Sequence, residues 1–262
     1  MIDKVRADAA AAVAGIEDGS TVMISGFGRA GQPVELIDAL IGLGPNELTI
    51  VSNNAGNGDV GLARLLAAGR VRKIVCSFPR QLDSWVFDGL YRAGEIELEL
   101  VPQGNLVERI RAAGAGIGAF FTPTGFGTPL AEGKETREID GRNYVLEYPI
   151  HADYALIGGY RADRLGNVIY RKTSRNFGPV MAAAATTSIV QVDEVVAVGA
   201  LDPEGIVTPG VFVDRVVTVG ERNWLEGGVF VGADDAEGNR GPASDRTAPG
   251  PAASARTKGD AA

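Results

Sequence analysis

The residues best suited to chemistry form a glycine-rich run, Gly26–Gly31 (GFGRAG), which follows a short apolar stretch. The run matches the G-x-G-x-x-G pattern of dinucleotide-binding loops. Its glycines permit positive φ and close approach of the backbone, so several N–H groups can converge on an oxygen that carries negative charge. Such a loop can bind a phosphate, and it can equally stabilise the oxyanion of an acyl transfer. Tight strand–helix packing with no ligand is the third interpretation.

Three neighbouring features argue against a dinucleotide. The next predicted strand ends in Ser52-Asn53-Asn54, where a dinucleotide fold places an acidic residue for the ribose hydroxyls. Pro33 lies where the following helix would already donate N–H groups to a pyrophosphate, and proline has no N–H. A helix predicted over Asp3–Gly15 also precedes the run, whereas the dinucleotide motif usually occupies the first βα turn. A dinucleotide-dependent oxidoreductase therefore stays only as an alternative.

Neutral polar side chains follow the other predicted strands. In an open parallel sheet, ligands bind beyond the carboxyl ends of the strands, so these residues are candidates for one site. Amide side chains there can hold carbonyls and carboxylates without adding charge, although any one of them could equally be a helix cap or turn former. The strand-end motifs are Ser52-Asn53-Asn54-Ala55-Gly56, Ser77-Phe78-Pro79-Arg80, Pro102-Gln103-Gly104 and Thr122-Pro123-Thr124-Gly125.

These strand-end motifs contain no Asp or Glu. The single His and single Cys exclude a two-His zinc site, a thiolate-rich metal site and an intramolecular disulfide, so no metal is expected. Cys76 falls in an apolar run and is interpreted as a core residue. The chain thus offers groups that bind and stabilise, without an evident nucleophile or base.

The elements that must position these residues alternate along the chain from residue 3 to residue 121. Alternating strands and helices predict βαβ units, and hence an α/β fold with an open, mostly parallel sheet and helices on both faces. The predicted strands are Thr21–Ser25, Leu48–Ser52, Lys73–Ser77, Glu97–Val101 and Ile117–Phe121. The predicted helices are Asp3–Gly15, Pro33–Leu43, Val60–Ala68, Asp83–Ala93 and Leu106–Ala113.

The pattern changes after residue 122. A hairpin is predicted over residues 137–147 with its turn at Asp140-Gly141, and it forms an antiparallel insertion. A second hairpin is predicted to pair Ala155–Ile157 with Val168–Tyr170. A helix over Gly178–Thr187 then leads into a strand over Ile189–Val198.

One folded domain is predicted over residues 1–231, because no linker-like stretch interrupts it. Residues 232–262 contain no Val, Ile, Leu, Met, Phe, Trp or Tyr. Such a segment cannot offset its ordering entropy by burial, so it is predicted to be a disordered tail.

Charge and hydropathy bound the partners. The chain has 25 Lys and Arg against 33 Asp and Glu, a net charge of −8, which argues against nucleic acid. Its first residues carry no hydrophobic signal core. The charge-free run over residues 112–131 contains five Gly and two Pro, so it is not expected to span a membrane. A cytoplasmic protein is expected.

Together these motifs resemble the A subunit of the class I coenzyme A transferases that act on 3-oxoacids. Residues 18–33 are similar to the family's Asp-Gly, three apolar residues, Gly-Gly-Phe and Gly-x-Pro signature, although Ser25 stands where the family usually has glycine. The resemblance covers residues 3–219 and implies a fold shared with sugar-phosphate isomerases, which remain an alternative function. The other matching motifs are Ser52–Gly56, Pro102–Leu106, Phe121–Thr128 and Arg171–Phe177.

The resemblance implies that the nucleophilic Glu belongs to a B subunit, with which this chain forms a heterodimer or heterotetramer. Coenzyme A passes through a glutamyl-CoA intermediate on that partner, and the thioester is a substrate, so no cofactor is implied. By family position, the substrate-binding and oxyanion-stabilising residues are Gly26, Phe27, Gly28, Gly31, Asn53, Asn54 and Gln103.

The same resemblance bears on the acyl acceptor. The loop Gly28–Gly31 and the stretch Ser77–Gln81 look most like the branch that acts on 3-oxoadipate in aromatic catabolism, with succinyl-CoA as donor. The acetoacetate enzymes, which are the alternative, have an apolar residue where Arg29 stands. Because 3-oxoadipate has a second carboxylate, Arg29 is the candidate to bind it bidentately, with Arg80 as the second candidate.

Overall fold

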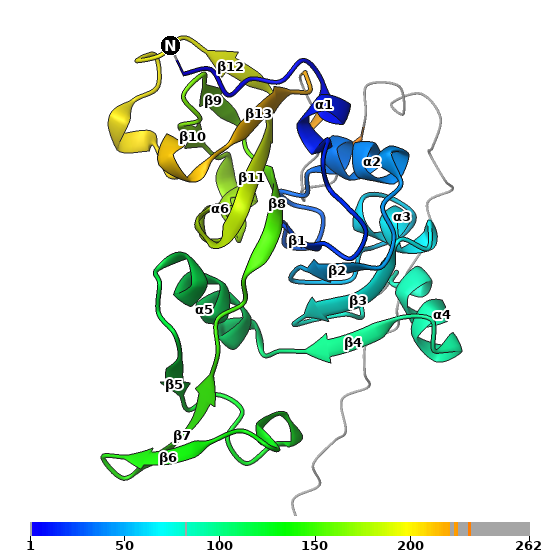
Figure 1. Ribbon diagram of the computed structural model, residues 1–262, viewed down its shortest axis with the longest axis vertical. Helices are drawn as coiled ribbons and strands as arrows, with labels where there is room; N and C mark the ends of the chain where they lie inside the picture. Colours follow the sequence, from blue (N-terminus) through cyan, green and yellow to red (C-terminus); the bar gives the residue numbers. More distant parts are fainter. Residues whose placement is uncertain (1, 82, 221–222, 225–229, 232–262) are drawn as a thin grey trace, which may run out of the picture.

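The computed structural model describes residues 2–81, 83–220, 223–224 and 230–231 (Figure 1). The predicted tail, residues 232–262, lies outside the described residues. The described part is built on a seven-stranded sheet in the order β13-β11-β8-β1-β2-β3-β4, in which every neighbouring pair is parallel. Its strands are β1 (Thr21–Ile24), β2 (Leu48–Val51), β3 (Val71–Cys76), β4 (Glu97–Leu100), β8 (Ala152–Gly158), β11 (Ala185–Val192) and β13 (Arg215–Thr218).

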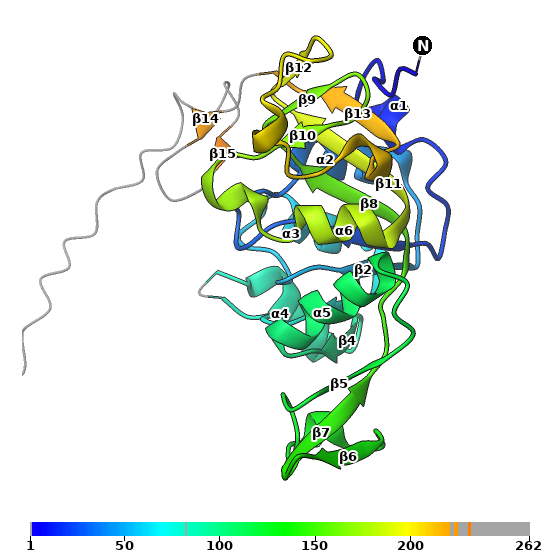
Figure 2. The same ribbon diagram turned by 90° about the vertical axis from the view of Figure 1, so that its left-hand side faces the viewer.

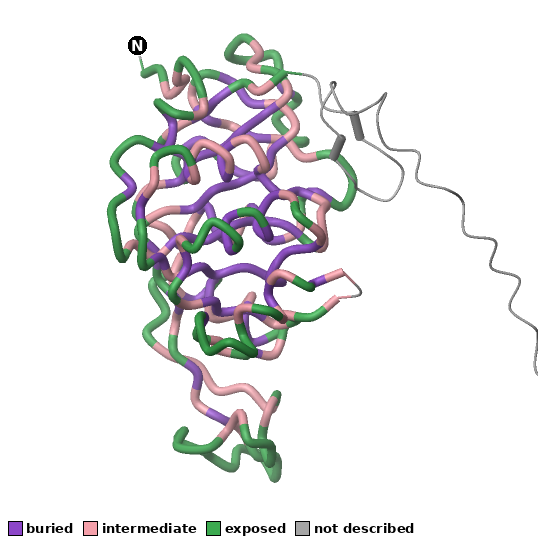
Figure 3. Tube along the Cα trace, turned by 90° about the vertical axis from the view of Figure 1, so that its right-hand side faces the viewer, coloured by how far each residue is buried: buried purple, intermediate pink, exposed green. Residues whose placement is uncertain are grey.

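Helices cover both faces of this sheet, as predicted (Figure 2). On one face, α1 (Ala9–Val13), α2 (Val34–Leu43), α3 (Leu62–Ala67) and α4 (Trp85–Ala93) pack in one apolar cluster with Val22 and Ile24. On the other, α5 (Gln103–Gly114) and α6 (Gly178–Ala184) pack with Met23, whose side chain points opposite to its neighbours. Burial is concentrated in the middle of the body (Figure 3), in strands such as β1, β2, β8 and β11, whereas the edge strand β4 is partly exposed.

The strand order reverses beside β1. The chain builds β2, β3 and β4 outward on one side of β1 and then returns to place β8 on its other side. Ligands in open α/β sheets bind at such a switch point, beyond the carboxyl ends of the strands. The glycine run therefore starts at the position in the sheet where a site is most expected.

Residues 120–147 form an arm that extends away from the body (Figure 1). It is an antiparallel sheet of β5 (Phe120–Thr122), β7 (Arg142–Glu147) and β6 (Thr136–Ile139), with a short helix η1 (Pro129–Ala131) between β5 and β6. Asp140 and Gly141 both have positive φ, 51° and 74°, as a two-residue type I′ hairpin requires. The predicted hairpin and its turn are confirmed.

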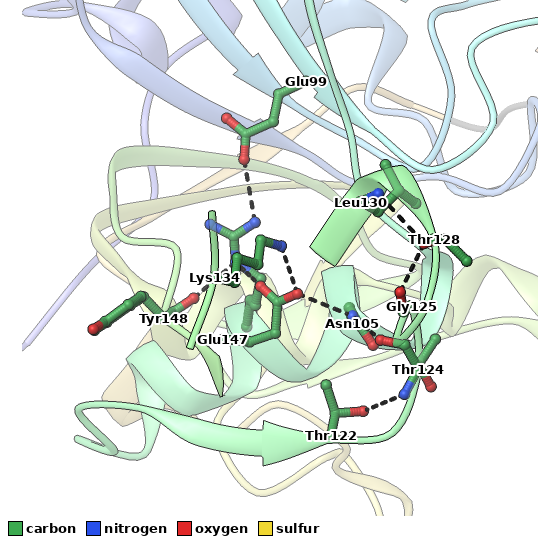
Figure 4. A network of polar contacts seen from close by, with 11 residues as sticks. Glu99, Asn105, Thr122, Thr124, Gly125, Thr128, Leu130, Lys134, Glu147 and Tyr148 are labelled. Carbon is green, nitrogen blue, oxygen red and sulfur yellow. Dashed lines mark hydrogen bonds and ion pairs between the residues drawn. The ribbon is translucent and has the colours of Figure 1, made fainter. Parts of the chain in front are cut away.

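A buried polar network holds the base of the arm against α5 (Figure 4). The Glu147 carboxylate is 4 % exposed and accepts hydrogen bonds from Lys134 Nζ at 2.7 Å and Asn105 Nδ2 at 3.2 Å. Arg109 Nε lies 3.8 Å from it and donates to the Tyr148 carbonyl at 2.7 Å. One carboxylate thus joins the arm to the helix that begins at Gln103.

Two predicted strands pair differently in the structure. The prediction that Ile117–Phe121 extends the parallel sheet is wrong, because β5 pairs antiparallel with β7 in the arm. The predicted pairing of Ala155–Ile157 with Val168–Tyr170 is also wrong, because residues 155–157 belong to the central strand β8. The turn at residues 165–167 is present, and it joins β9 (Arg161–Asp163) to β10 (Val168–Ile169).

Three further boundaries differ. The predicted helix over Asp3–Gly15 is helical only at Ala9–Val13, because Val5 is extended and bridges to Val216 of β13. Helix α6 ends at Ala184, and the strand starts directly afterwards. The predicted strand Ile189–Val198 divides at Asp193 into β11 and β12 (Glu194–Val196), which joins the small sheet beside β9.

The remaining short elements are η2 (Lys172–Arg175), η3 (Pro203–Gly205), η4 (Gly210–Phe212) and the antiparallel pair β14 (Asn223–Trp224) and β15 (Phe230–Val231). Within the described residues, no helix combines the length and the apolar character needed to cross a membrane.

Candidate functional site

The carboxyl ends of β1, β2, β3 and β4 bring most of the predicted site residues together. We call this region the carboxyl edge; it consists of residues 26–31, 52–54, 77–78 and 102–103. Asn54 bridges to Phe78, and direct hydrogen bonds join the segments after β1, β2, β3 and β4. The prediction that Thr122–Gly125 lies at the same edge is wrong: this segment lies in the arm, because β5 is not part of the main sheet.

The glycine run folds into a tight two-residue turn. Phe27 N–H donates to the Ala30 carbonyl at 2.9 Å, and Ala30 N–H donates back to the Phe27 carbonyl at 3.2 Å. Gly28, the first residue inside the turn, has φ 61°, and Arg29 has no positive φ, the signature of a type II′ turn. Only glycine adopts that first position without strain, so the turn explains Gly28 directly.

Side chains from distant elements anchor the turn to the sheet. Ser25 Oγ donates to the Gly31 carbonyl at 2.7 Å and accepts from Gly158 N–H of β8 at 3.1 Å. Asn176 Oδ1 accepts from Gly26 N–H at 3.1 Å, and its Nδ2 donates to the Ala30 carbonyl at 2.9 Å. Ser25 therefore links the glycine turn to β8, the strand on the other side of β1.

Gly31 is required for a different reason. A Cβ at this position would lie 2.6 Å from the Ser174 carbonyl oxygen, which real side chains do not tolerate. The loop backbone thus packs directly on the segment Lys172–Asn176, and no side chain separates them.

The Gly28 carbonyl points into the protein. It accepts hydrogen bonds from Gln32 Nε2 at 3.1 Å and from Asn54 Nδ2 at 3.4 Å. Asn54 is fully buried, and its Oδ1 accepts from Gly56 N–H at 2.9 Å. Both ends of the Asn54 amide are therefore engaged in shaping the loop.

Asn53 and Gln103 form the second half of the edge. Asn53 Oδ1 accepts from Ser77 Oγ at 2.7 Å and from Gln103 Nε2 at 2.8 Å, which fixes the orientation of the Asn53 amide. Its Nδ2 has no partner among the described residues. Gln103 is exposed at the start of α5, and one hydrogen of its amide nitrogen remains after the bond to Asn53. The exposed Gln103 amide and the buried Asn53 amide are thus held side by side, each with a donor left over.

The two candidate arginines differ in their surroundings. The Arg29 guanidinium passes beside Gly58 and lies 3.7 Å from the Asp83 carboxylate, which also accepts from Asn57 Nδ2 at 2.6 Å. Arg80 Nε instead donates to Asp88 of α4 at 2.6 Å on an exposed surface. Only Arg29 is part of the loop that carries the turn, and each of the two guanidinium groups lies beside an Asp carboxylate.

Two residues that shape the loop were not singled out from the sequence. Gln32 lies one residue after the glycine run, and Asn176 lies in the motif Arg171–Phe177 used for the resemblance. Their amides look like ordinary loop residues until the tertiary contacts are known. The only signal available was their place inside the matching motifs.

Titratable groups near the edge are few. Within the described residues, no three His, Cys, Asp or Glu side chains lie close enough together to hold a metal ion. Burial raises the pKa of the Cys76 thiol to about 12, although a hydrogen bond from the Phe78 backbone opposes the shift. Burial likewise raises the pKa of Tyr170 to about 12, and its hydroxyl bonds Thr208 at 2.8 Å.

Cys76 should therefore resist alkylation in the folded chain. With a pKa of about 12, roughly one thiol in 10⁴ is thiolate at pH 8, and only the thiolate reacts. Iodoacetamide labelling followed by mass spectrometry should give no adduct at pH 8 in buffer and complete labelling in denaturant. Rapid labelling of the native chain would contradict the buried position.

Comparison with known proteins places these features in context. The family model for coenzyme A transferase matches residues 6–218. The A subunit of the 3-oxoadipate CoA-transferase of Pseudomonas putida is 69% identical over 219 residues, covering 84% of this chain and 95% of that protein. The A subunit of the succinyl-CoA:3-ketoacid coenzyme A transferase of Xanthomonas campestris pv. campestris (strain B100) is 50% identical, covering 80% of this chain and 87% of that one.

A solved structure shares the fold. The acyl-CoA transferase apoenzyme of Escherichia coli O157:H7 superposes with a TM-score of 0.71 at 25% identity, covering 82% of this chain. This chain spans 47% of that longer chain, so about half of the solved protein has no counterpart here.

Proposed function

Since the chain belongs to the coenzyme A transferase family, we propose that it is the A subunit of an enzyme that moves coenzyme A from succinyl-CoA to 3-oxoadipate. The observation that carries this proposal is a carboxyl edge rich in donors, with no carboxylate among its motifs, in a chain 69% identical to one half of a transferase named for that activity. A B subunit supplies the missing carboxylate. The assembly is a heterodimer or heterotetramer.

In the proposed reaction, the thioester carbonyl carbon of succinyl-CoA is attacked by a glutamate of the B subunit. The C–S bond breaks, coenzyme A leaves as thiolate, and a mixed anhydride remains. The thiolate then attacks the glutamyl carbonyl carbon and expels succinate, which leaves a glutamyl-CoA thioester. The carboxylate of 3-oxoadipate resolves that thioester by the same two steps in reverse. The thioester is a substrate throughout, so the chemistry needs no resident cofactor.

This chain would contribute binding and charge stabilisation. Negative charge develops on the oxygen of the carbonyl under attack in each step, and donors fixed in place stabilise it without reorganising. Gln103 and Asn53 offer side-chain N–H groups, and the turn Phe27–Ala30 offers backbone N–H groups, all at the carboxyl edge. The proposal gives Gly28, Asn53 and Gln103 these contacts with the substrate. Gly26, Phe27 and Gly31 shape the loop, because the N–H groups of Gly26 and Phe27 donate within the chain and Gly31 is buried.

In this proposal, Arg29 sets the preference of the enzyme for 3-oxoadipate over acetoacetate. The Arg29→Leu variant should raise KM for 3-oxoadipate by about 10–100-fold, since a hydrogen bond to a charged group contributes about 1.5–3 kcal/mol. KM for acetoacetate, which lacks the second carboxylate, should change little. Steady-state kinetics with both acceptors measure the difference.

The Arg80→Leu variant tests the second candidate under the same conditions. A selective rise in KM for 3-oxoadipate in this variant alone would transfer the role to Arg80. Equal effects of Arg29→Leu on both acceptors would remove Arg29 from substrate recognition.

The proposed function is tested by expressing the chain with and without a B subunit of the same family. The chain alone should be inactive, and the assembled enzyme should transfer coenzyme A from succinyl-CoA to 3-oxoadipate faster than to acetoacetate. The reverse preference would favour the acetoacetate-type activity, to which the relative at 50% identity corresponds by name. Isomerase activity of the chain alone, or binding of a nicotinamide cofactor, would reject the proposal.

A further inference from the structure

We propose that the backbone N–H of Arg29 is a donor to the thioester oxyanion, and that Gln32 and Asn54 are positioning residues that set its direction. This inference rests on the proposed function and assigns one atom of the site.

Most backbone N–H groups of the loop, residues 26–32, already have acceptors within the chain. Those of Phe27 and Ala30 close the turn, that of Gly26 donates to Asn176, and that of Gln32 donates to the Arg29 carbonyl at 3.4 Å. Among the described residues, the N–H groups of Gly28, Arg29 and Gly31 have no acceptor. Gly31 is buried, which leaves the two residues at the tip of the turn.

Two hydrogen bonds set the direction of the peptide between Gly28 and Arg29. The Gly28 carbonyl accepts from Gln32 Nε2 at 3.1 Å and Asn54 Nδ2 at 3.4 Å, and both donors are almost completely buried beneath the loop. A carbonyl oxygen has two lone pairs and can take both bonds. In a trans peptide the N–H points opposite to the C=O, so the Arg29 N–H points outward from the buried amides.

The Gln32 and Asn54 amides are themselves held in place at their oxygen atoms. Gln32 Oε1 accepts from Leu62 N–H of α3 at 3.4 Å, and the contact is so close that Gly61 could carry no Cβ beside it. Asn54 Oδ1 accepts from Gly56 N–H at 2.9 Å. Because both amides are held at their other end, the Gly28–Arg29 peptide cannot turn without breaking two buried hydrogen bonds. A donor fixed in this way stabilises a developing charge at no reorganisation cost.

A matched pair of variants separates the N–H of Arg29 from its side chain. Arg29→Ala removes the guanidinium and keeps the N–H, whereas Arg29→Pro removes both. The φ of Arg29 is not positive, and its N–H has no acceptor among the described residues, so proline can enter the turn without breaking a hydrogen bond of the folded chain there. The two variants should therefore share the same loss of the side chain and differ in the donor.

The readout is the first half-reaction of the assembled enzyme. The assembly is mixed with succinyl-CoA, and formation of the coenzyme A thioester on its B subunit is followed by mass spectrometry, so that 3-oxoadipate takes no part. Arg29→Pro should form the thioester about 10²–10³-fold more slowly than Arg29→Ala, the effect of losing one oxyanion donor. Equal rates for the two variants, both well folded by circular dichroism, would overturn the proposal.

Gln32→Met keeps the inference testable if Arg29→Pro does not fold. This variant preserves side-chain size and leaves the Gly28 carbonyl with Asn54 alone. It should lower kcat about tenfold, since the peptide gains freedom to turn, while KM for succinyl-CoA stays within about twofold. A merely structural role would instead lower thermal stability with no change in kcat, which would contradict the assignment. Activity of the unmodified assembly shows separately whether the proposed function holds.

Discussion

Gln103→Ala should lower kcat of the assembled enzyme by about 10²–10³-fold while the chain stays folded. Gln103 lies at the first position of α5, is exposed, and is held by a 2.8 Å bond from its Nε2 to Asn53 Oδ1. The truncation removes a donor worth about 2.7–4 kcal/mol in a transition state with an oxyanion. It also releases the Asn53 amide, whose orientation then depends on Ser77 alone.

Steady-state kinetics of the assembled enzyme measure this effect, with thermal unfolding as the check on folding. Glu108→Ala is the matched control, because Glu108 is a polar residue of the same helix, half exposed, that pairs with Arg111 at 2.7 Å. Its kcat should stay within about twofold of the parent. Parent-like turnover in Gln103→Ala would remove Gln103 from the site.

Glu147→Gln should destabilise the chain by about 3 kcal/mol, the lower end of the range for breaking a buried ion pair. The change keeps the shape and the bond to Asn105 but removes the charge that faces Arg109 and Lys134. Arg109 is only 16 % exposed, so its charge would lose a buried partner. It retains Glu99 at 3.2 Å, and Lys134 is partly solvated, which is why the lower end applies.

Urea unfolding followed by circular dichroism gives the stability change, and hydrogen exchange at β7 shows whether the arm loosens first. Glu135→Gln is the control, since it is the same chemical change in the same arm. The pair between Glu135 and Arg137 is exposed on both sides, so this variant should differ from the parent by no more than about 1 kcal/mol. Equal stability of the two variants would show that the network does not hold the arm.

Much of the fold follows from local pattern. The first four predicted strands match β1 to β4 within about two residues, because apolar runs between helical segments leave little freedom in an α/β fold. The partner of each strand was harder to predict. β5 carries the same kind of apolar residues as a core strand, and only its neighbour β7 decides that it belongs to the arm.

The site residues show the same contrast between what local pattern predicts and what long-range contacts decide. Gly28, Asn53 and Gln103 stand at strand ends, so sequence order alone places them at one edge. Asn176 contacts Gly26 across 150 residues of chain, and no pattern in either segment announces that bond. Among the residues that shape the loop, Asn54 was named from its place at a strand end, whereas Gln32 and Asn176 were not.

The pairing of β1 with β8 has a consequence for how the chain folds. Thr21 N–H at the start of β1 bonds the Asp153 carboxylate, 132 residues later, so the two strands meet only after a very long loop has closed. Contacts of such sequence separation form late and slow the folding of a domain. The same loop closure brings Gly158 and Asn176 within hydrogen-bonding distance of Ser25 and Gly26, which flank the glycine turn. A chain that lacks β8 and the segment after it has neither the Gly158 nor the Asn176 bond to the loop, so we expect the loop that recognises substrate to reach its final geometry late in folding.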